Sequence, residues 1–257
     1  MTLLRIVAFV AALVAAFDAC PYTRPETLAA HVGFMQRMGN ALPAALAFRD
    51  ESGRSVRLGD YYGDVPIVLV FAWFGCRTLC STVIGNLAQS VAKTDVAPDR
   101  YRVIVASIDP RDAPADAVRM KRRAVVEEDA TAWHFLTGRE DAIDALADAV
   151  GFRYVYDADT HQYAHPAGFV ILTPDGRVSR YFFGFDFAPS QLRDALRDAG
   201  NDAIASPVDR LLLLCFHFAP TGRYSADVLQ ALRIGSVLLL GCTLVFVVVK
   251  RRTASSG

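Results

Sequence analysis

The sequence has no net excess of charge, because its 27 lysines and arginines are matched by 27 aspartates and glutamates. A chain without a net field is not drawn to nucleic acid or to an anionic surface by its overall charge. Internal repeats and low-complexity tracts are also absent from the sequence. With few prolines (12) and glycines (17) and a hydrophobic content of 53%, the 257 residues predict one substantial ordered domain with appendages.

The N-terminus has the pattern of a secretory signal. Arg5 is an early positive charge, an apolar stretch continues to Ala15, and small residues at its end fit a cleavage site. We therefore expect a signal peptide at residues 1–16 and a leader segment at 17–43. The two alternatives are an uncleaved anchor and lipidation at Cys20, although the residues before Cys20 match a lipobox poorly.

A second apolar run lies near the C-terminus, where residues 234–249 carry no charge and three basic residues follow at once. The run is short for a bilayer of about 30 Å, but it can extend backwards if Arg233 snorkels. We expect a transmembrane helix at 231–249, between a juxtamembrane segment at 204–230 and a tail at 250–257. The tail is expected to be cytoplasmic, because basic residues that flank a membrane span tend to lie on the cytoplasmic side. The alternative is a buried core helix, which the lack of a polar stripe disfavours.

Between these ends, the hydrophobic periodicity predicts strands that alternate with helices. A hairpin at 46–63 leads into a continuous apolar strand at 66–74, which is typical of a strand buried on both faces. A terminal hairpin is expected to turn at residues 174–176. We expect helices at 82–94, 113–128, 139–151 and 188–200, and further strands within 101–110, 132–138, 152–157 and 167–184. These elements predict a mixed α/β sheet over residues 44–203, with helices on both faces.

Two cysteines, Cys76 and Cys80, follow the apolar strand at the start of a predicted helix, where they can form a disulfide, a redox dithiol or half of a metal site. Positions i and i+4 of a regular helix place Cβ atoms about 6 Å apart, whereas a disulfide needs about 3.8 Å, so the spacing disfavours a staple. Two thiolates on one metal need sulfurs only about 4 Å apart. The helix N-terminus and Arg77 predict a lowered thiol pKa, which serves a metal ligand and a redox nucleophile equally.

Two sulfurs alone make a labile metal site, so we expect a third ligand among the five histidines. His134 lies in a short apolar strand and is typical of a core or rim residue. His161 and His165 lie in the loop that enters the last hairpin, which comes up beside the cysteines in such a sheet, and either can be the donor. A Cys2His set suits Cu(I), with Zn(II) as the competitor if a fourth ligand exists.

These residues together resemble the Sco/SenC family of copper-binding, thioredoxin-fold proteins. The likeness is carried by "CRTLC", by "SIDPRD" after the second central strand and by "AHPAGFVILTPDGRVSRYFFG". It continues into "PVDRLLLLCFHFAPTGRY", which is similar to the tail of a bacterial branch that ends in a membrane helix. The chain departs from the family in lacking proline within or directly after the cysteine pair.

The resemblance implies a thioredoxin-like sheet and copper ligands at Cys76, Cys80 and His165, with Asp109 in a supporting role near the metal. At the end of a central strand, the Asp109 carboxylate can orient a ligand or assist proton transfer, or it can simply form a turn. Cys215 and His217 form a further C-x-H pair near the predicted membrane helix. For that pair, a buried free cysteine and an incidental histidine are the simpler interpretation.

The resemblance also implies delivery of copper to the CuA centre of cytochrome c oxidase. We therefore expect a copper chaperone anchored in the bacterial inner membrane, with its soluble domain in the periplasm and Cu(I) or Cu(II) as cargo. Its expected partners are oxidase subunit II and other periplasmic copper carriers, and not nucleic acid. The alternative is an enzyme, a thiol:disulfide oxidoreductase with Cys76 and Cys80 as its redox pair. In an oxidising compartment, this pair can be disulfide-bonded unless it is kept reduced or metallated.

Overall fold

The computed structural model describes residues 31–76, 79–125, 131–158 and 160–205. The predicted signal peptide, transmembrane helix and cytoplasmic tail, together with Cys20, Cys215 and His217, lie outside these residues. Contacts divide the chain into two units, residues 1–204 and 205–257, and the fold below belongs to the first. Within the described ranges, no helix is both long enough and apolar enough to cross a membrane.

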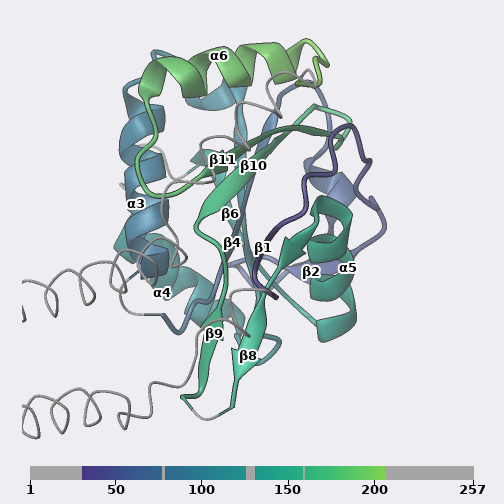
Figure 1. Ribbon diagram of the computed structural model, residues 1–257, viewed down its shortest axis with the longest axis vertical. Helices are drawn as coiled ribbons and strands as arrows, with labels where there is room; N and C mark the ends of the chain where they lie inside the picture. Colours follow the sequence, from purple (N-terminus) through teal and green to yellow (C-terminus); the bar gives the residue numbers. More distant parts are fainter. Residues whose placement is uncertain (1–30, 77–78, 126–130, 159, 206–257) are drawn as a thin grey trace, which may run out of the picture. The chain divides into compact units, whose positions relative to one another are not determined.

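A seven-stranded mixed sheet runs through the centre of the first unit, in the order β11-β10-β4-β5-β6-β2-β3 (Figure 1). Its three parallel strands are β4 (Ile67–Ala72), β5 (Arg102–Ser107) and β6 (Trp133–Gly138). An antiparallel hairpin flanks each side: β10 (Gly168–Leu172) and β11 (Val178–Phe183) beside β4, and β2 (Ala47–Arg49) and β3 (Ser55–Arg57) beside β6. Both predicted hairpins and the strands predicted within 66–74, 101–110 and 132–138 are confirmed.

Every residue of β4 is buried, as expected of the continuous apolar run that forms it. Alternate side chains point to opposite faces of a strand, and β4 accordingly contributes to two hydrophobic clusters. Val68 and Val70 belong to one cluster, and Leu69 and Phe71 belong to the other. The sheet therefore has a core on each face, and each core needs helices to cover it.

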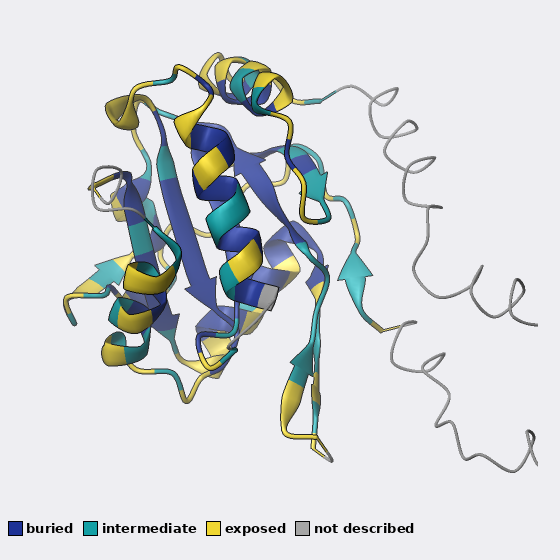
Figure 2. Cartoon of the chain, turned by 90° about the vertical axis from the view of Figure 1, so that its left-hand side faces the viewer, coloured by how far each residue is buried: buried dark blue, intermediate teal, exposed yellow. Residues whose placement is uncertain are grey.

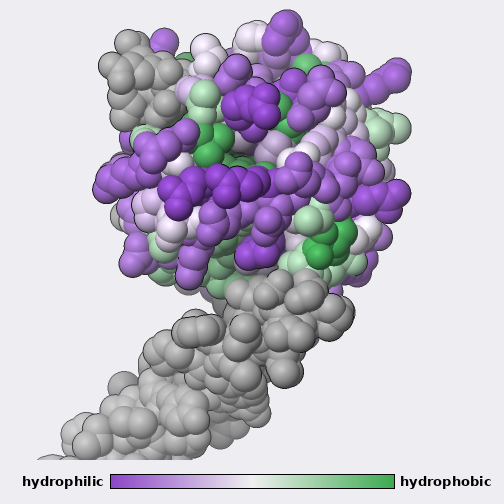
Figure 3. Space-filling model, turned by 90° about the horizontal axis from the view of Figure 1, so that it is seen from above, coloured by the Kyte–Doolittle hydropathy of each residue, from purple (hydrophilic) through white to green (hydrophobic). Residues whose placement is uncertain are grey.

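Helices cover both faces, which confirms the predicted layers. The first cluster is covered by α3 (Leu79–Ala92), α4 (Pro114–Ala124) and α6 (Pro189–Gly200), and the second by α5 (Glu140–Val150) (Figure 1). Each helix buries one stripe of its surface, and on α6 the stripe is Leu192, Ala195, Leu196 and Ala199. The face of the molecule that lies over α6 is correspondingly rich in hydrophilic side chains (Figure 3).

Gly151 ends α5, as its position in the sequence predicts. It adopts a left-handed conformation with φ of 65°, and its N–H donates to Ala147 and Asp148 carbonyls of the last turn. A Cβ atom built at Gly151 would lie 1.9 Å from the Met35 carbonyl oxygen, so only glycine fits here. The helix end is thus packed directly against the segment that precedes the sheet.

The predicted single strand at 152–157 is wrong, because the structure divides it in two. β7 (Phe152–Arg153) pairs with β1 (Gly33–Phe34), and β8 (Val155–Asp157) pairs with β9 (Gln162–Ala164). The β8–β9 hairpin projects from the body of the domain and bonds to no other described strand (Figure 2). The break arises because the two halves bond to partners far apart in the chain.

Part of the predicted leader packs on the domain. The Phe34 ring meets the rings of Phe152, Tyr181 and Phe183 at centroid distances of 5.3, 5.5 and 5.5 Å, and Leu42 is buried. These contacts bury apolar surface on the second cluster. The folded unit therefore includes residues ahead of 44.

Candidate metal site

Cys76 closes a tight turn between β4 and α3, which we call the cysteine turn (residues 73–76). The Cys76 N–H donates to the Trp73 carbonyl over 3.0 Å. The Trp73 ring lies so close to Gly75 that a Cβ atom there would sit 2.7 Å from the indole nitrogen, which explains the glycine in "WFGC". Cys76 is not helical, and the first described residue of α3 is Leu79, so Cys76 lies outside the regular helix in which the sequence predicted both cysteines.

Cys80 lies in α3 and is only 3% exposed, whereas Cys76 is half-buried. Both thiols are free of disulfides. The two cysteines therefore present one sulfur in the core and one near the surface, at the carboxyl end of β4.

His165 is the histidine that reaches the cysteines. It lies between β9 and β10, and its Nε2 is 3.3 Å from the Cys80 sulfur. Its Nδ1 is 3.0 Å from the Pro166 carbonyl oxygen, an acceptor, so the geometry assigns the ring proton to Nδ1. The Nε2 lone pair then faces the sulfur. The other candidate, His161, is exposed and contacts the Tyr156 hydroxyl at 3.1 Å instead.

Burial sets the protonation of this pair. It raises the pKa of Cys80 to about 12, and the neighbouring Cys76 adds to the effect. It also lowers the pKa of His165. A neutral Cys80 thiol therefore donates to a neutral imidazole at pH 7. The predicted lowering of the thiol pKa is wrong for Cys80, since burial outweighs the helix N-terminus.

The Cys80–His165 pair has donors suited to a soft metal ion. A metal ion binds sulfur at about 2.3 Å and an imidazole nitrogen at about 2.0 Å. Two such donors on one metal lie roughly 3.5 Å apart, which is close to the 3.3 Å between the Cys80 sulfur and His165 Nε2. Among the described residues, no group of three or more Cys, His, Asp or Glu side chains is already arranged around one point. The described donors thus supply a preformed pair, and Cys76 stands next to residues 77–78, which the structure does not describe.

Asp109 is buried at the end of β5, but its carboxylate faces Arg111. The Arg111 guanidinium donates two hydrogen bonds to it, of 2.8 and 2.9 Å, and the Arg111 backbone N–H donates a third, of 2.9 Å. Burial alone would raise the pKa of Asp109, but the bonds from Arg111, helped by one from Tyr163, hold it below its usual range. Tyr163 belongs to β9, the strand that leads to His165. Asp109 therefore connects to the histidine segment through Tyr163.

Asp112, a residue that the sequence did not single out, contacts the cysteine turn. Its Oδ2 accepts a hydrogen bond from the Phe74 N–H over 3.0 Å and another from the Ser107 hydroxyl over 2.6 Å. Burial raises its pKa. The only signal in the sequence is the second aspartate of "SIDPRD", which a turn explains equally well.

The remaining histidine with a sequence-based assignment behaves as expected. His134 is half-buried on β6, and its ring lies 4.8 Å from that of Tyr61. Burial lowers its pKa. This is the environment of a core or rim histidine, as predicted.

Fold and site together define a thioredoxin-like α/β protein that gathers a cysteine pair and a histidine at one edge of its sheet. Residues 14–199 match the family described as SCO1/SenC, and the chain belongs to that family. No curated protein matches the chain in sequence.

Solved structures share this fold. A putative electron transfer protein from Aquifex aeolicus VF5 is 22% identical, with a TM-score of 0.58 over 65% of this chain and 96% of that one. Copper-bound ScoI from Bradyrhizobium japonicum is 20% identical, with a TM-score of 0.51 over 62% and 99%. BsSco, described as a cytochrome c oxidase assembly protein with a disulfide switch, is 21% identical, with a TM-score of 0.53 over 65% and 98%.

Proposed function

We propose that this protein is a copper chaperone for the CuA centre of cytochrome c oxidase and binds copper through Cys76, Cys80 and His165. The observation that carries the proposal is the 3.3 Å contact between the Cys80 sulfur and Nε2 of His165, the ring nitrogen that carries no proton. Membership of the SCO1/SenC family supports it, as do the copper in Bradyrhizobium japonicum ScoI and the oxidase-assembly role given for BsSco.

In this proposal the imidazole ring of His165 is already oriented for metal binding before copper arrives. The Nδ1–H bond to the Pro166 carbonyl holds the imidazole so that Nε2 faces Cys80. Copper takes the place of the Cys80 proton between the two donors, and that proton leaves to solvent. Sulfur and imidazole are donors that suit Cu(I).

The anchor and the compartment belong to the same proposal. The predicted signal peptide at 1–16 and transmembrane helix at 231–249 would hold the domain on the periplasmic side of a bacterial inner membrane. Oxidase subunit II and other periplasmic copper carriers are the partners that fit this position. The domain would then meet its recipients at the membrane surface.

A second candidate is a thiol:disulfide oxidoreductase that keeps the cysteines of copper proteins reduced. The observation in its favour is the unequal pair, since Cys76 is half-exposed and Cys80 is buried. An accessible thiol attacks a substrate disulfide, and a buried neighbour resolves the mixed disulfide. This chemistry needs no imidazole as a third metal donor.

Replacement of His165 separates the two functions. We expect His165→Ala to weaken Cu(I) binding about tenfold or more, because it removes one donor, and to leave the thiol count and the reduction of a disulfide substrate unchanged. Binding is measured on the reduced full-length protein in detergent by competition with a chromogenic Cu(I) chelator.

His161→Ala is the matched control, because it removes a histidine from the same segment that does not contact the cysteines. It should bind copper as the parent does. If His165→Ala holds copper as tightly as the parent, the Cys2His assignment is wrong.

A further inference from the structure

We infer that Asp112 is a positioning residue that holds the cysteine turn, and with it Cys76, against the end of β5. The inference rests on the proposed function in treating Cys76 as a copper ligand. Its basis is one carboxylate oxygen with two donors, the Phe74 N–H at 3.0 Å and the Ser107 hydroxyl at 2.6 Å.

The hydrogen bond from the Phe74 N–H to Asp112 lies within the cysteine turn itself. The Phe74 side chain is buried, and its ring lies 5.9 Å from that of Phe135. Its N–H donates to the Asp112 carboxylate in the loop that follows β5. The N–H of a buried residue needs an acceptor, so we expect the turn to shift if the carboxylate is lost. Cys76 is two residues away and moves with it.

The same loop also reaches the histidine half of the site, through Asp109. The Ser107 hydroxyl that donates to Asp112 accepts from the Asp109 N–H over 3.0 Å. The Asp109 carboxylate binds Arg111, whose guanidinium lies 4.9 Å from the Tyr156 ring centroid on β8. Residues 107–112 thus connect the segment that carries Cys76 with the hairpin that precedes His165. Within this loop, Asp112 is the residue that contacts the cysteine turn.

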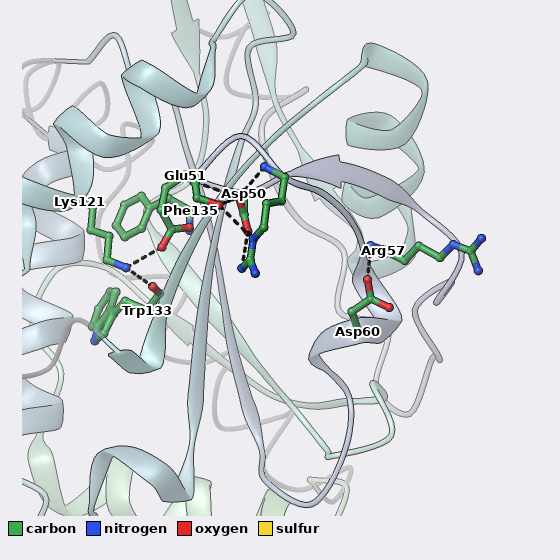
Figure 4. Close-up of polar contacts among 9 residues, drawn as sticks. Asp50, Glu51, Arg57, Asp60, Lys121, Trp133 and Phe135 are labelled. Carbon is green, nitrogen blue, oxygen red and sulfur yellow. Dashed lines mark hydrogen bonds and ion pairs between the residues drawn. The ribbon is translucent and has the colours of Figure 1, made fainter.

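Glu51 offers a matched control elsewhere in the fold (Figure 4). Its carboxylate also accepts one backbone N–H at 3.0 Å, from Phe135, and one side-chain donor at 2.6 Å, from Lys121. The bonds are alike in number and length, but they tie the β2–β3 turn to β6 and α4 instead of holding the cysteine turn. Substitutions at Glu51 therefore report the loss of a comparable tie without the proposed positioning role.

The test uses full-length protein in detergent, with Cys20, Cys215 and Cys242 replaced by serine so that only Cys76 and Cys80 titrate. Asp112→Ala and Asp112→Asn are compared with Glu51→Ala and Glu51→Gln. Two quantities are measured: Cu(I) affinity by chelator competition, and the dithiol–disulfide equilibrium of the copper-free pair in glutathione buffers.

We expect Asp112→Ala to weaken copper binding about tenfold and to shift the glutathione equilibrium at least about threefold, since both depend on where Cys76 lies. Asp112→Asn should restore both to within about threefold, because an amide oxygen still accepts the Phe74 N–H. Both Glu51 variants should stay within about threefold of the parent. Ser107→Ala, which removes the second donor, should give a smaller shift in the direction of Asp112→Ala.

The possible outcomes distinguish failure of the positioning role of Asp112 from failure of the proposed copper-binding function. Parent-like values for Asp112→Ala, or an equal loss in Glu51→Ala, would overturn the positioning role. If Asp112→Ala does not fold, Ser107→Ala decides, and no shift in that variant overturns the role as well. If the parent binds no copper while the thiol equilibrium still shifts in Asp112→Ala and recovers in Asp112→Asn, the proposed function fails and the role of Asp112 stands.

Discussion

Cys76 and Cys80 lie four positions apart in the chain but in unlike surroundings. Cys80 is 3% exposed and in contact with His165, whereas Cys76 is half-buried at the end of the cysteine turn. Their accessibility to reagents in solution must differ accordingly, whatever their shared role.

Iodoacetamide should therefore modify Cys76 before Cys80 in the reduced, metal-free protein, with Cys80 slower by about tenfold or more because its sulfur is buried. Mass spectrometry of peptides sampled over time measures the two rates. Protein unfolded in urea serves as the control, in which the rates should converge. Equal rates in the folded protein would contradict the described burial of Cys80.

The sequence identified the two cysteines and narrowed the third donor to two histidines, but the finer features of the site depend on packing. His165 and His161 are four residues apart, and only the path of β9 shows which of them meets Cys80. The direction of the Cys80 pKa shift follows from burial by residues distant in sequence. Asp112 was missed because an aspartate after a strand predicts a turn equally well.

The turn between β2 and β3 shows how a short element is held to the sheet. The Glu51 carboxylate accepts hydrogen bonds from Lys121 on α4 and from the Phe135 N–H on β6 (Figure 4). Burial alone would raise the pKa of Glu51, but these two donors hold it below its usual value of 4.5. A lowered folded-state pKa stabilises the fold above the ordinary pKa, and this stabilisation is lost as the pH falls through the folded value.

Acid should therefore destabilise the parent more steeply than Glu51→Gln. We expect the thermal midpoint of the parent to fall further between about pH 5 and about pH 3 than that of the variant, which has no carboxylate to protonate there. At pH 7 the variant should be less stable by about 1–3 kcal/mol, because a charged acceptor is lost. Calorimetry over this pH range measures both.

Asp60→Asn is the control for the acid experiment, since its carboxylate is exposed and accepts only the Arg57 N–H among the described contacts (Figure 4). This variant should keep the steep pH dependence of the parent. Parallel curves for the parent and Glu51→Gln would show that Glu51 does not contribute to acid sensitivity.

Local patterns predicted most elements because their hydrophobic periods agree with their positions in the fold. β4 is a continuous apolar run in the middle of the sheet, and Val83, Leu87 and Val91 of α3 all lie in the first cluster. The division of 152–157 into β7 and β8 could not be predicted this way. Its cause is pairing with β1 and β9, and a period of two does not encode which partner a strand takes.

For the chain as a whole, the layered architecture follows from composition and alternation of elements, whereas the anchor stays a prediction. Strands that alternate with helices predict a sheet with helices on both faces, and the two clusters confirm it. The span expected at 231–249 lies outside the described residues. It requires its own experiment.

Full-length protein should sediment with membranes after alkaline carbonate extraction and enter solution only with detergent, because a transmembrane helix is embedded in the bilayer. A fragment of residues 31–205 should stay in the supernatant and unfold cooperatively on heating. Immunoblotting of the fractions measures the partition. Release of the full-length protein by carbonate would rule out the span.

The neutral state of Cys80 and His165 bears on how cargo enters and leaves. If Cu(I) binds as proposed, it would replace the Cys80 proton, and one monovalent cation would take the place of another between the two donors. Loading at Cys80 and His165 alone would then be an ion exchange that leaves the net charge of these two residues unchanged. Protons and copper would then compete for the same position, so a lower pH would favour release of the metal.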